Sequence, residues 1–184
     1  MKVIVITDWS VRDCFERVRA AAAVSAEVAV QHRNHGAPRD VFVEQARRLR
    51  EVCPRLFINS DVELARELGA GLHLPEHLVV EFERETTRAV HAPLRGNTGR
   101  GRSAHFLVSP VFNPNSKPAE RPALGPAGFH RLAATLPGPA FALGGITADR
   151  ISELKPLAGI AVIGAVMHAD DAARATEALL RALD

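Results

Sequence analysis

The chain has 184 residues, of which 47% are hydrophobic and 24% charged, as in a globular protein and unlike a disordered one. Its formal net charge is only +2, from 23 lysines and arginines and 21 aspartates and glutamates, which argues against a nucleic-acid-binding protein. Two distant cysteines exclude a disulfide scaffold, no apolar run is long enough to span a bilayer, and we expect one cytoplasmic domain over residues 1–184.

In the first half of the chain, short apolar runs alternate with longer amphipathic stretches. Strands are predicted at 3–7, 28–31, 56–59 and 71–74, and helices at 13–24, 41–52 and 62–68. The helix at 41–52 is typical, because Val41, Ala46 and Leu49 form one apolar stripe and its arginines face water. The charged segment 81–88 is expected to form a further brief helix.

The same alternation continues to the end of the chain. Strands are predicted at 89–92, 106–112, 140–143 and 160–166, and helices at 126–136 and 170–183. A helix capped by Thr147 should run through Leu157, with Asp149 in its first turn. The strands are continuous apolar runs, which is typical of parallel strands covered on both faces.

Eight strands, nearly all followed by a helix, predict an α/β fold with a single (β/α)8 TIM barrel. No G-x-G-x-x-G follows the first strand, which argues against a dinucleotide-binding open sheet. Because barrels usually need roughly 200 residues or more, one unit should be trimmed. Residues 93–102 contain three glycines and no helical period, so we expect a shortened fifth helix there.

A barrel places its active face at the carboxyl ends of the strands, where this sequence carries polar residues and glycines. The polar residues expected there are Asp8, Gln31, Arg33, Asn59, His73, His91, Ser109 and Lys117. Such a set favours a polar ligand. No His/Cys spacing typical of a metal site occurs, so no metal ligand is predicted from these residue types.

Glycines follow the last two predicted strands. Gly144-Gly145 comes after the seventh, and Ile163-Gly164 lies at the end of the eighth. Free backbone N–H groups at such junctions bind phosphate in many barrels, so we predict a phosphate cradle here. The alternative is that the glycines only permit tight turns.

Lysine and histidine side chains offer further chemistry, each with a structural alternative. Lys117, in the polar loop after the sixth strand, is either a point charge for a diphosphate or a solvated loop residue. His73 and His91 are acid–base groups or buried structural groups.

Seven segments, in order and spacing, resemble the thiamin phosphate synthase superfamily, which includes thiazole tautomerases. They are Ile6-Thr7-Asp8, Val30-Gln31-His32-Arg33, Phe57-Ile58-Asn59, Gly69-Ala70-Gly71-Leu72-His73-Leu74, Ser109-Pro110-Val111-Phe112 with Lys117, Leu143-Gly144-Gly145-Ile146-Thr147, and Ile160-Ala161-Val162-Ile163. The resemblance runs nearly end to end.

The resemblance implies an enzyme that joins hydroxymethylpyrimidine diphosphate to thiazole phosphate and releases pyrophosphate with the help of Mg²⁺. It implies that Gln31 and Asn59 touch the pyrimidine substrate and that Lys117 meets the diphosphate. Lys117 and His91 are the expected catalytic residues. The expected substrate-binding residues are Gln31, Arg33, His35, Asn59, Ser116, Gly144, Gly145, Ile163 and Gly164.

Several positions depart from the family pattern. The Mg²⁺-binding aspartate after Asn59 is replaced by Ser60, and only Glu76 stands near the position of a second one. The other departures are His35 for a lysine, Ala89 for a serine, Pro114 and Ser116 for two threonines, and Pro110 for the catalytic histidine of the tautomerases. Mg²⁺ prefers hard oxygen ligands such as carboxylates. Because aspartates are absent from both positions, the expected Mg²⁺ ligands are not preserved.

Three functions follow from this pattern. The first is a thiamin phosphate synthase, the second a metal-independent isomerase of the thiazole tautomerase kind, and the third a noncatalytic relative that binds a phosphorylated ligand. All three act on small phosphorylated molecules, and a homodimer is the default oligomer.

Overall fold

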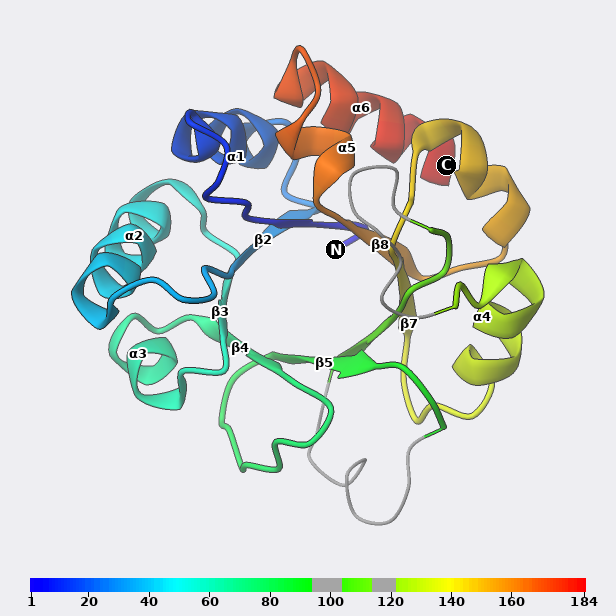
Figure 1. The fold of residues 1–184 in the computed structure, drawn as a ribbon, viewed down its shortest axis with the longest axis horizontal. Coiled ribbons are helices and arrows are strands. Elements are labelled where there is room, and N and C mark those ends of the chain that lie inside the picture. The colour runs from blue at the N-terminus through cyan, green and yellow to red at the C-terminus, as the bar shows by residue number, and fades with distance from the viewer. Residues whose placement is uncertain (94–103, 114–121) are drawn as a thin grey trace.

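The computed structural model describes residues 1–93, 104–113 and 122–184. Its eight strands are parallel and close into one barrel in sequence order, with helices around the outside (Figure 1). The predicted (β/α)8 barrel is confirmed. No helix within the described ranges is long and apolar enough to cross a membrane.

The strands are short and hydrogen-bonded to their neighbours in the closed order. They are β1 (Val3–Ile6), β2 (Val28–His32), β3 (Leu56–Asn59), β4 (Gly71–Leu74), β5 (Thr86–Val90), β6 (His105–Val108), β7 (Ala140–Leu143) and β8 (Gly159–Val162). The helices are α1 (Cys14–Ala23), α2 (Arg39–Val52), α3 (Val62–Glu67), α4 (Gly125–Ala133), the 3₁₀ helix η2 (Ala148–Leu154), α5 (Gly164–Met167) and α6 (Ala172–Leu183).

Two apolar layers hold the barrel together. A large layer packs between the strands and the helices, and a smaller one fills the interior around Phe57 and Phe141. These rings need glycine opposite them: a Cβ on Gly71 would lie 2.5 Å from the Phe57 ring, and one on Gly159 2.4 Å from the Phe141 ring. Aromatic rings and glycines on neighbouring strands therefore fill the interior together.

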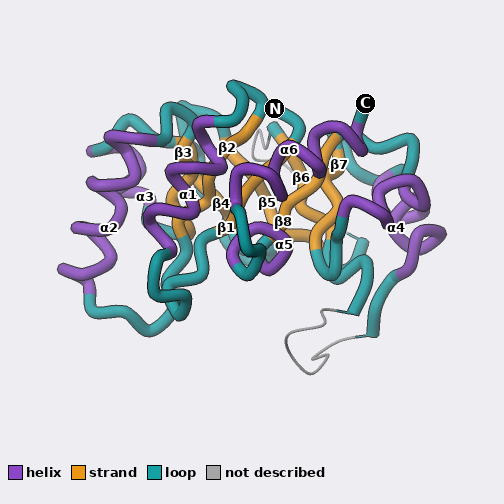
Figure 2. The backbone as a smooth tube through the Cα atoms, turned by 90° about the horizontal axis from the view of Figure 1, so that it is seen from above, coloured by secondary structure: helices purple, strands orange, loops and turns teal. Residues whose placement is uncertain are grey.

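Both chain termini lie at the end of the barrel where the strands begin (Figure 2). The Lys2 ammonium pairs there with the Asp184 carboxylate at 2.6 Å. Side-chain caps begin two helices, because Asp171 accepts from the Arg174 N–H in α6 and Asp61 accepts from the Leu64 N–H in α3. The opposite end of the barrel is left to the loops that follow the strands.

The predicted helix at 81–88 is wrong. Residues 75–85 form an irregular connection, and β5 begins at Thr86. The fully buried side chain of Arg88 lies under this connection and donates to the Leu78 carbonyl at 2.8 Å. Of the charged residues that indicated an exposed helix, Arg88 belongs to a covered strand and the others lie in the irregular connection.

Other boundaries also differ. The segment after Thr147 forms a 3₁₀ helix ending at Leu154, and the Thr147 side chain makes no capping hydrogen bond. The strands predicted to reach 112 and 166 end at Val108 and Val162. The fifth helix, predicted to be shortened at 93–102, falls almost wholly in residues 94–103, outside the described residues.

Candidate functional site

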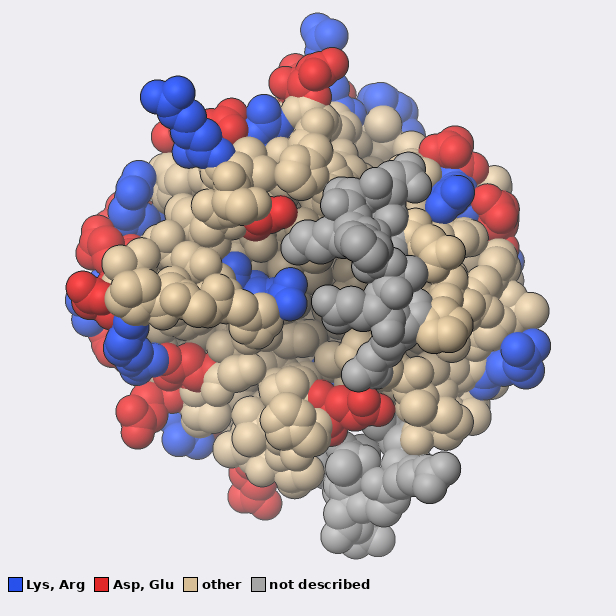
Figure 3. All heavy atoms as spheres, in the orientation of Figure 1, with Lys and Arg blue, Asp and Glu red and all other residues tan. Residues whose placement is uncertain are grey.

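The carboxyl ends of the strands gather the predicted polar residues at one end of the barrel. Asn59 of β3 is the register partner of His73 on β4, and Gln31 of β2 pairs with Phe57 of β3. Figure 3 shows this end hollowed at its centre, with basic and acidic side chains around the hollow. The expected convergence on one face is therefore present for these described residues.

Gln31 is the most informative buried polar residue. Its side chain is 2% exposed, and its Oε1 has no hydrogen-bond partner among the described residues. Leaving a buried carbonyl oxygen without a donor costs about 1–3 kcal/mol. An oxygen of this kind near the carboxyl end of a barrel strand is suited to accept a hydrogen bond from a ligand.

Arg33 is held firmly by the neighbouring strand. The Thr7 hydroxyl donates to the Arg33 carbonyl at 2.8 Å and accepts from the Arg33 N–H at 2.9 Å. The Arg33 Nε then donates to Nε2 of His35 at 2.7 Å, so that nitrogen carries no proton. Burial and the Arg33 charge both lower the pKa of His35. His35 thus does not supply the positive charge of the lysine found there in the family.

His32 is a structural residue next to this arginine. Its Nδ1 accepts from the Trp9 indole at 3.2 Å, and its Nε2 donates to the Phe42 carbonyl at 3.0 Å. Its ring stacks on Phe42 at 4.2 Å. Burial lowers the pKa of His32 to about 4, which keeps the ring neutral. Trp9 packs against His32 in this cluster.

The two histidines considered for acid–base chemistry have different surroundings. His73 is buried and bonds the Thr87 hydroxyl at 2.8 Å, and burial, aided by the Arg33 charge, lowers its pKa to about 3. It is neutral near pH 7. His91 lies just past β5, with Nδ1 2.9 Å from the Ser109 carbonyl. Because a carbonyl only accepts, Nδ1 is the donor in this contact.

The junction after β7 has the backbone needed for an anion cradle. Gly144 and Gly145 have φ of +99° and +61°, and a Cβ on Gly145 would lie 2.7 Å from the Asn113 carbonyl oxygen. No described residue accepts a hydrogen bond from the N–H of Gly144, Gly145 or Gly164. Ile163 immediately precedes α5 at the second junction. These donors are therefore available to a ligand as far as the described residues are concerned.

The carboxylates at the end of β3 do not fit a divalent cation. Ser60 occupies the position of the expected aspartate, and the following Asp61 is engaged by both oxygens, one by the Leu64 N–H and one by Arg39. Across the described ranges, no three His, Cys, Asp or Glu residues are grouped as metal ligands. The donors present, an amide and a hydroxyl on Asn59 and Ser60, are poor substitutes for carboxylates.

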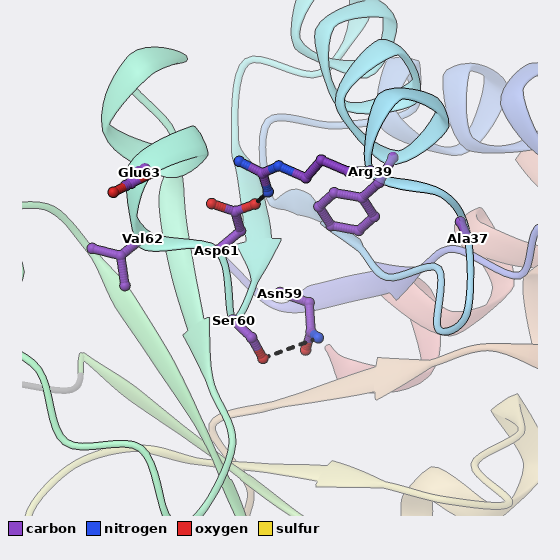
Figure 4. A pocket seen from close by; sticks show the side chains of 8 residues that line it. Ala37, Arg39, Asn59, Ser60, Asp61, Val62 and Glu63 are labelled. Carbon is purple, nitrogen blue, oxygen red and sulfur yellow. Dashed lines mark hydrogen bonds and ion pairs between the residues drawn. The ribbon is translucent and has the colours of Figure 1, made fainter.

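An open pocket of about 660 Å³ lies beside Asn59, between the loops that follow β2 and β3 (Figure 4). It is lined by Ala37, Arg39, Phe42, Asn59, Ser60, Asp61, Val62 and Glu63. Figure 4 shows the Asn59 and Ser60 side chains pointing toward each other, with the Arg39–Asp61 pair above them. The Asn59 amide donates to the Ser60 hydroxyl at 3.2 Å.

Sequence reasoning missed Thr7 as an anchor and Arg39 as a pocket residue. Thr7 had a signal, since it is a polar residue at the end of an apolar strand, whereas Arg39 had none among the other exposed arginines of α2. The predicted site residues Ser116 and Lys117 lie in 114–121, outside the described residues.

Comparison with known proteins supports one family. Residues 3–166 match the profile of the family described as "Thiamine monophosphate synthase". The thiamine-phosphate synthase of Salinispora arenicola is 34% identical over 187 residues, covering 90% of this chain and 88% of that protein. That of Pyrococcus furiosus is 28% identical over 198 residues, covering 100% and 95%. That of Synechococcus sp. is 32% identical over 193 residues, covering 94% of this chain but only 53% of its own length.

A solved structure agrees with these sequence relatives. The thiamine phosphate pyrophosphorylase from Pyrococcus furiosus superposes with a TM-score of 0.85 at 25% identity, covering 99% of this chain and 95% of that one. The similarity therefore extends over the whole barrel.

Proposed function

The chain belongs to the thiamine monophosphate synthase family, which comprises transferases of thiamine biosynthesis, and we propose that it joins hydroxymethylpyrimidine diphosphate to thiazole phosphate. The named relatives are synthases, which favours this function over the isomerase and the noncatalytic relative. The observation that carries the proposal is the buried Gln31 oxygen at the strand ends, which has no hydrogen-bond partner among the described residues, because that position faces a substrate in the family pattern.

In the proposed reaction, the bond between the pyrimidine methylene carbon and the diphosphate oxygen breaks. Pyrophosphate leaves with the electron pair, and the thiazole then bonds to the pyrimidine cation, so the products are thiamin phosphate and pyrophosphate. Charge separates in this step, and a site that holds the leaving group and excludes water lowers the barrier. No role is assigned to Mg²⁺, the family's usual ion, because Ser60 stands in place of the expected aspartate and Asp61 is engaged by Leu64 and Arg39.

Gln31 and Asn59 are assigned to the pyrimidine. Gln31 Oε1 is buried and receives no hydrogen bond within residues 1–93, 104–113 and 122–184. Asn59 lies on the next strand, with its side chain at the edge of the open pocket. An amide side chain offers both a donor and an acceptor, as recognition of an aminopyrimidine edge requires. Their positions on rigid strands fix the orientation of the pyrimidine.

Arg33 and Lys117 are assigned to the diphosphate, with Ser116 and His35 as neutral neighbours. The two hydrogen bonds from Thr7 fix the Arg33 backbone, so its guanidinium starts from a rigid point on the strand. A guanidinium binds phosphate oxygens in a bidentate manner, and a lysine contributes a point charge.

The thiazole phosphate is assigned to backbone N–H groups at the ends of β7 and β8, those of Gly144, Gly145, Ile163 and Gly164. Gly144 and Gly145 have the left-handed backbone conformation, which other residues rarely adopt and which sets the direction of their peptide groups. His91, whose Nδ1 donates to the Ser109 carbonyl, is assigned to hydrogen-bond the substrates through Nε2. We expect the enzyme to work on these two small molecules as a homodimer in the cytoplasm.

The test is product formation. Purified protein, both substrates and Mg²⁺ should yield thiamin phosphate, detected by mass spectrometry, and Gln31→Ala should lower kcat/KM by at least tenfold. The control is Gln45→Ala, which removes a glutamine amide on α2 that bonds Asn34. If no product forms while thiazole phosphate still raises the melting temperature, the synthase assignment is wrong and a binding function remains.

A further inference from the structure

We propose that the substrate's diphosphate is bound without a divalent cation at the rim between β2 and β3. Arg39 is the key residue there, in addition to the Arg33 already assigned to the diphosphate. The inference depends on the proposed function for the identity of the anion. It starts from the disagreement between the family's use of Mg²⁺ and the side chains present in this chain.

The carboxylate that directly follows Ser60 is already engaged. One oxygen of Asp61 accepts from the Leu64 N–H and caps α3, and the other pairs with the Arg39 guanidinium. To bind a metal, Asp61 would have to give up its arginine or its helix. Arg39 can meet an anion without leaving Asp61, because the ion pair joins Asp61 to Nη1 and a guanidinium has further N–H donors.

Arg39 is placed to meet such an anion. It is the first residue of α2, its side chain is 61% exposed, and it lines the open pocket opposite Asn59 and Ser60 (Figure 4). Asp61 is only 15% exposed, so it keeps its ion pair with Arg39, and an anion reaches the exposed part of the guanidinium. A diphosphate oxygen pair matches the guanidinium fork at least as well as a carboxylate does.

The rest of the pocket suits an anion of this size. Its volume of about 660 Å³ exceeds what a diphosphate needs, and the Ser60 hydroxyl, which accepts from the Asn59 amide, keeps its own hydrogen to donate. Glu63 also lines the pocket, but Figure 4 shows its carboxylate pointing away from Asn59 and Ser60. With Ser60 replacing an aspartate, one negative charge that a metal would have balanced is already gone.

The experiment is calorimetric titration of inorganic pyrophosphate into the full chain, once with EDTA and once with Mg²⁺. The wild type should bind in both, with dissociation constants within threefold of each other. Arg39→Gln should weaken binding at least tenfold in EDTA, and Arg39→Lys should weaken it less, because the charge remains while the fork is lost.

Arg47→Gln is the matched control. Arg47 also lies on α2, is 54% exposed and pairs with one carboxylate, that of Glu67, outside the pocket. This variant should bind pyrophosphate as the wild type does, and thermal unfolding should show that all variants fold.

Two results would overturn the inference: loss of pyrophosphate binding in EDTA, or unchanged binding by folded Arg39→Gln. The proposed function fails separately. If pyrophosphate binds in EDTA through Arg39 but no thiamin phosphate forms, the anion site remains and the synthase assignment is wrong.

Discussion

Replacing Gly145 with alanine should weaken thiazole phosphate binding. The new Cβ would lie 2.7 Å from the Asn113 carbonyl oxygen and 2.8 Å from the Phe112 Cβ, closer than such contacts allow. The residue also keeps a φ of +61°, which costs a non-glycine residue about 1–2 kcal/mol. The peptide must therefore shift, and its N–H leaves the position where the phosphate oxygen is expected.

The size of the effect follows from the hydrogen bonds lost. A hydrogen bond to a charged group contributes about 1.5–3 kcal/mol, which corresponds to a roughly 10- to 100-fold weaker dissociation constant. Calorimetric titration with thiazole phosphate measures this directly. Urea unfolding measures the separate cost in stability.

Gly69→Ala is the control for backbone strain. Gly69 has a φ of +58°, nearly that of Gly145, but lies before β4, at the other end of the barrel. Its nearest neighbour would be the Arg84 Nη2 at an ordinary 3.5 Å. The Gly69→Ala variant should lose stability and keep its affinity for thiazole phosphate. Equal affinity in both variants would refute the assignment of the Gly145 amide to the phosphate.

Three further results are expected. The pKa of His32 is lowered from 6.5 to about 4, so the stability that its neutral ring provides is complete above pH 6.5 and is lost as the pH falls toward 4. At 1.36 kcal/mol per pH unit, the loss is roughly 3 kcal/mol of unfolding free energy. Urea unfolding of His32→Gln should show a shallower loss over that range, and equal slopes would contradict this. Thr7→Val should lower kcat/KM about tenfold by freeing Arg33, with rescue by Thr7→Ser, and a fully active valine variant would show that the anchor is unnecessary. Asp171→Ala should cost about 1 kcal/mol of unfolding free energy and leave kcat/KM unchanged, and a loss of turnover would contradict its purely structural role.

The barrel was predictable because each strand is a continuous apolar run. Such a run is stable only with both faces covered, and eight of them in β-α alternation leave few alternatives. The prediction failed where charge pattern misled it: Arg88 is buried under residues 75–85 by hydrogen bonds to backbone carbonyls, an arrangement that depends on tertiary structure. An irregular connection leaves no periodic signal.

The site was predictable to the extent that it sits on strands. Gln31, Asn59 and His73 come together because parallel strands end at the same face of the barrel. The role of Asp61 was not predictable, because its ion-pair partner Arg39 lies more than twenty residues away in the sequence, at the start of α2. The assignments of Ser116 and Lys117 stay predictions.

Phosphorus NMR of the complete reaction tests the coupling reaction most directly. When both substrates are present, the two resonances of the diphosphate ester should give way to the single resonance of pyrophosphate, with one thiamin phosphate formed for each pyrophosphate released. Without thiazole phosphate, the diphosphate ester should persist. Release of pyrophosphate at the same rate in its absence, or no release at all with both substrates, would contradict the account.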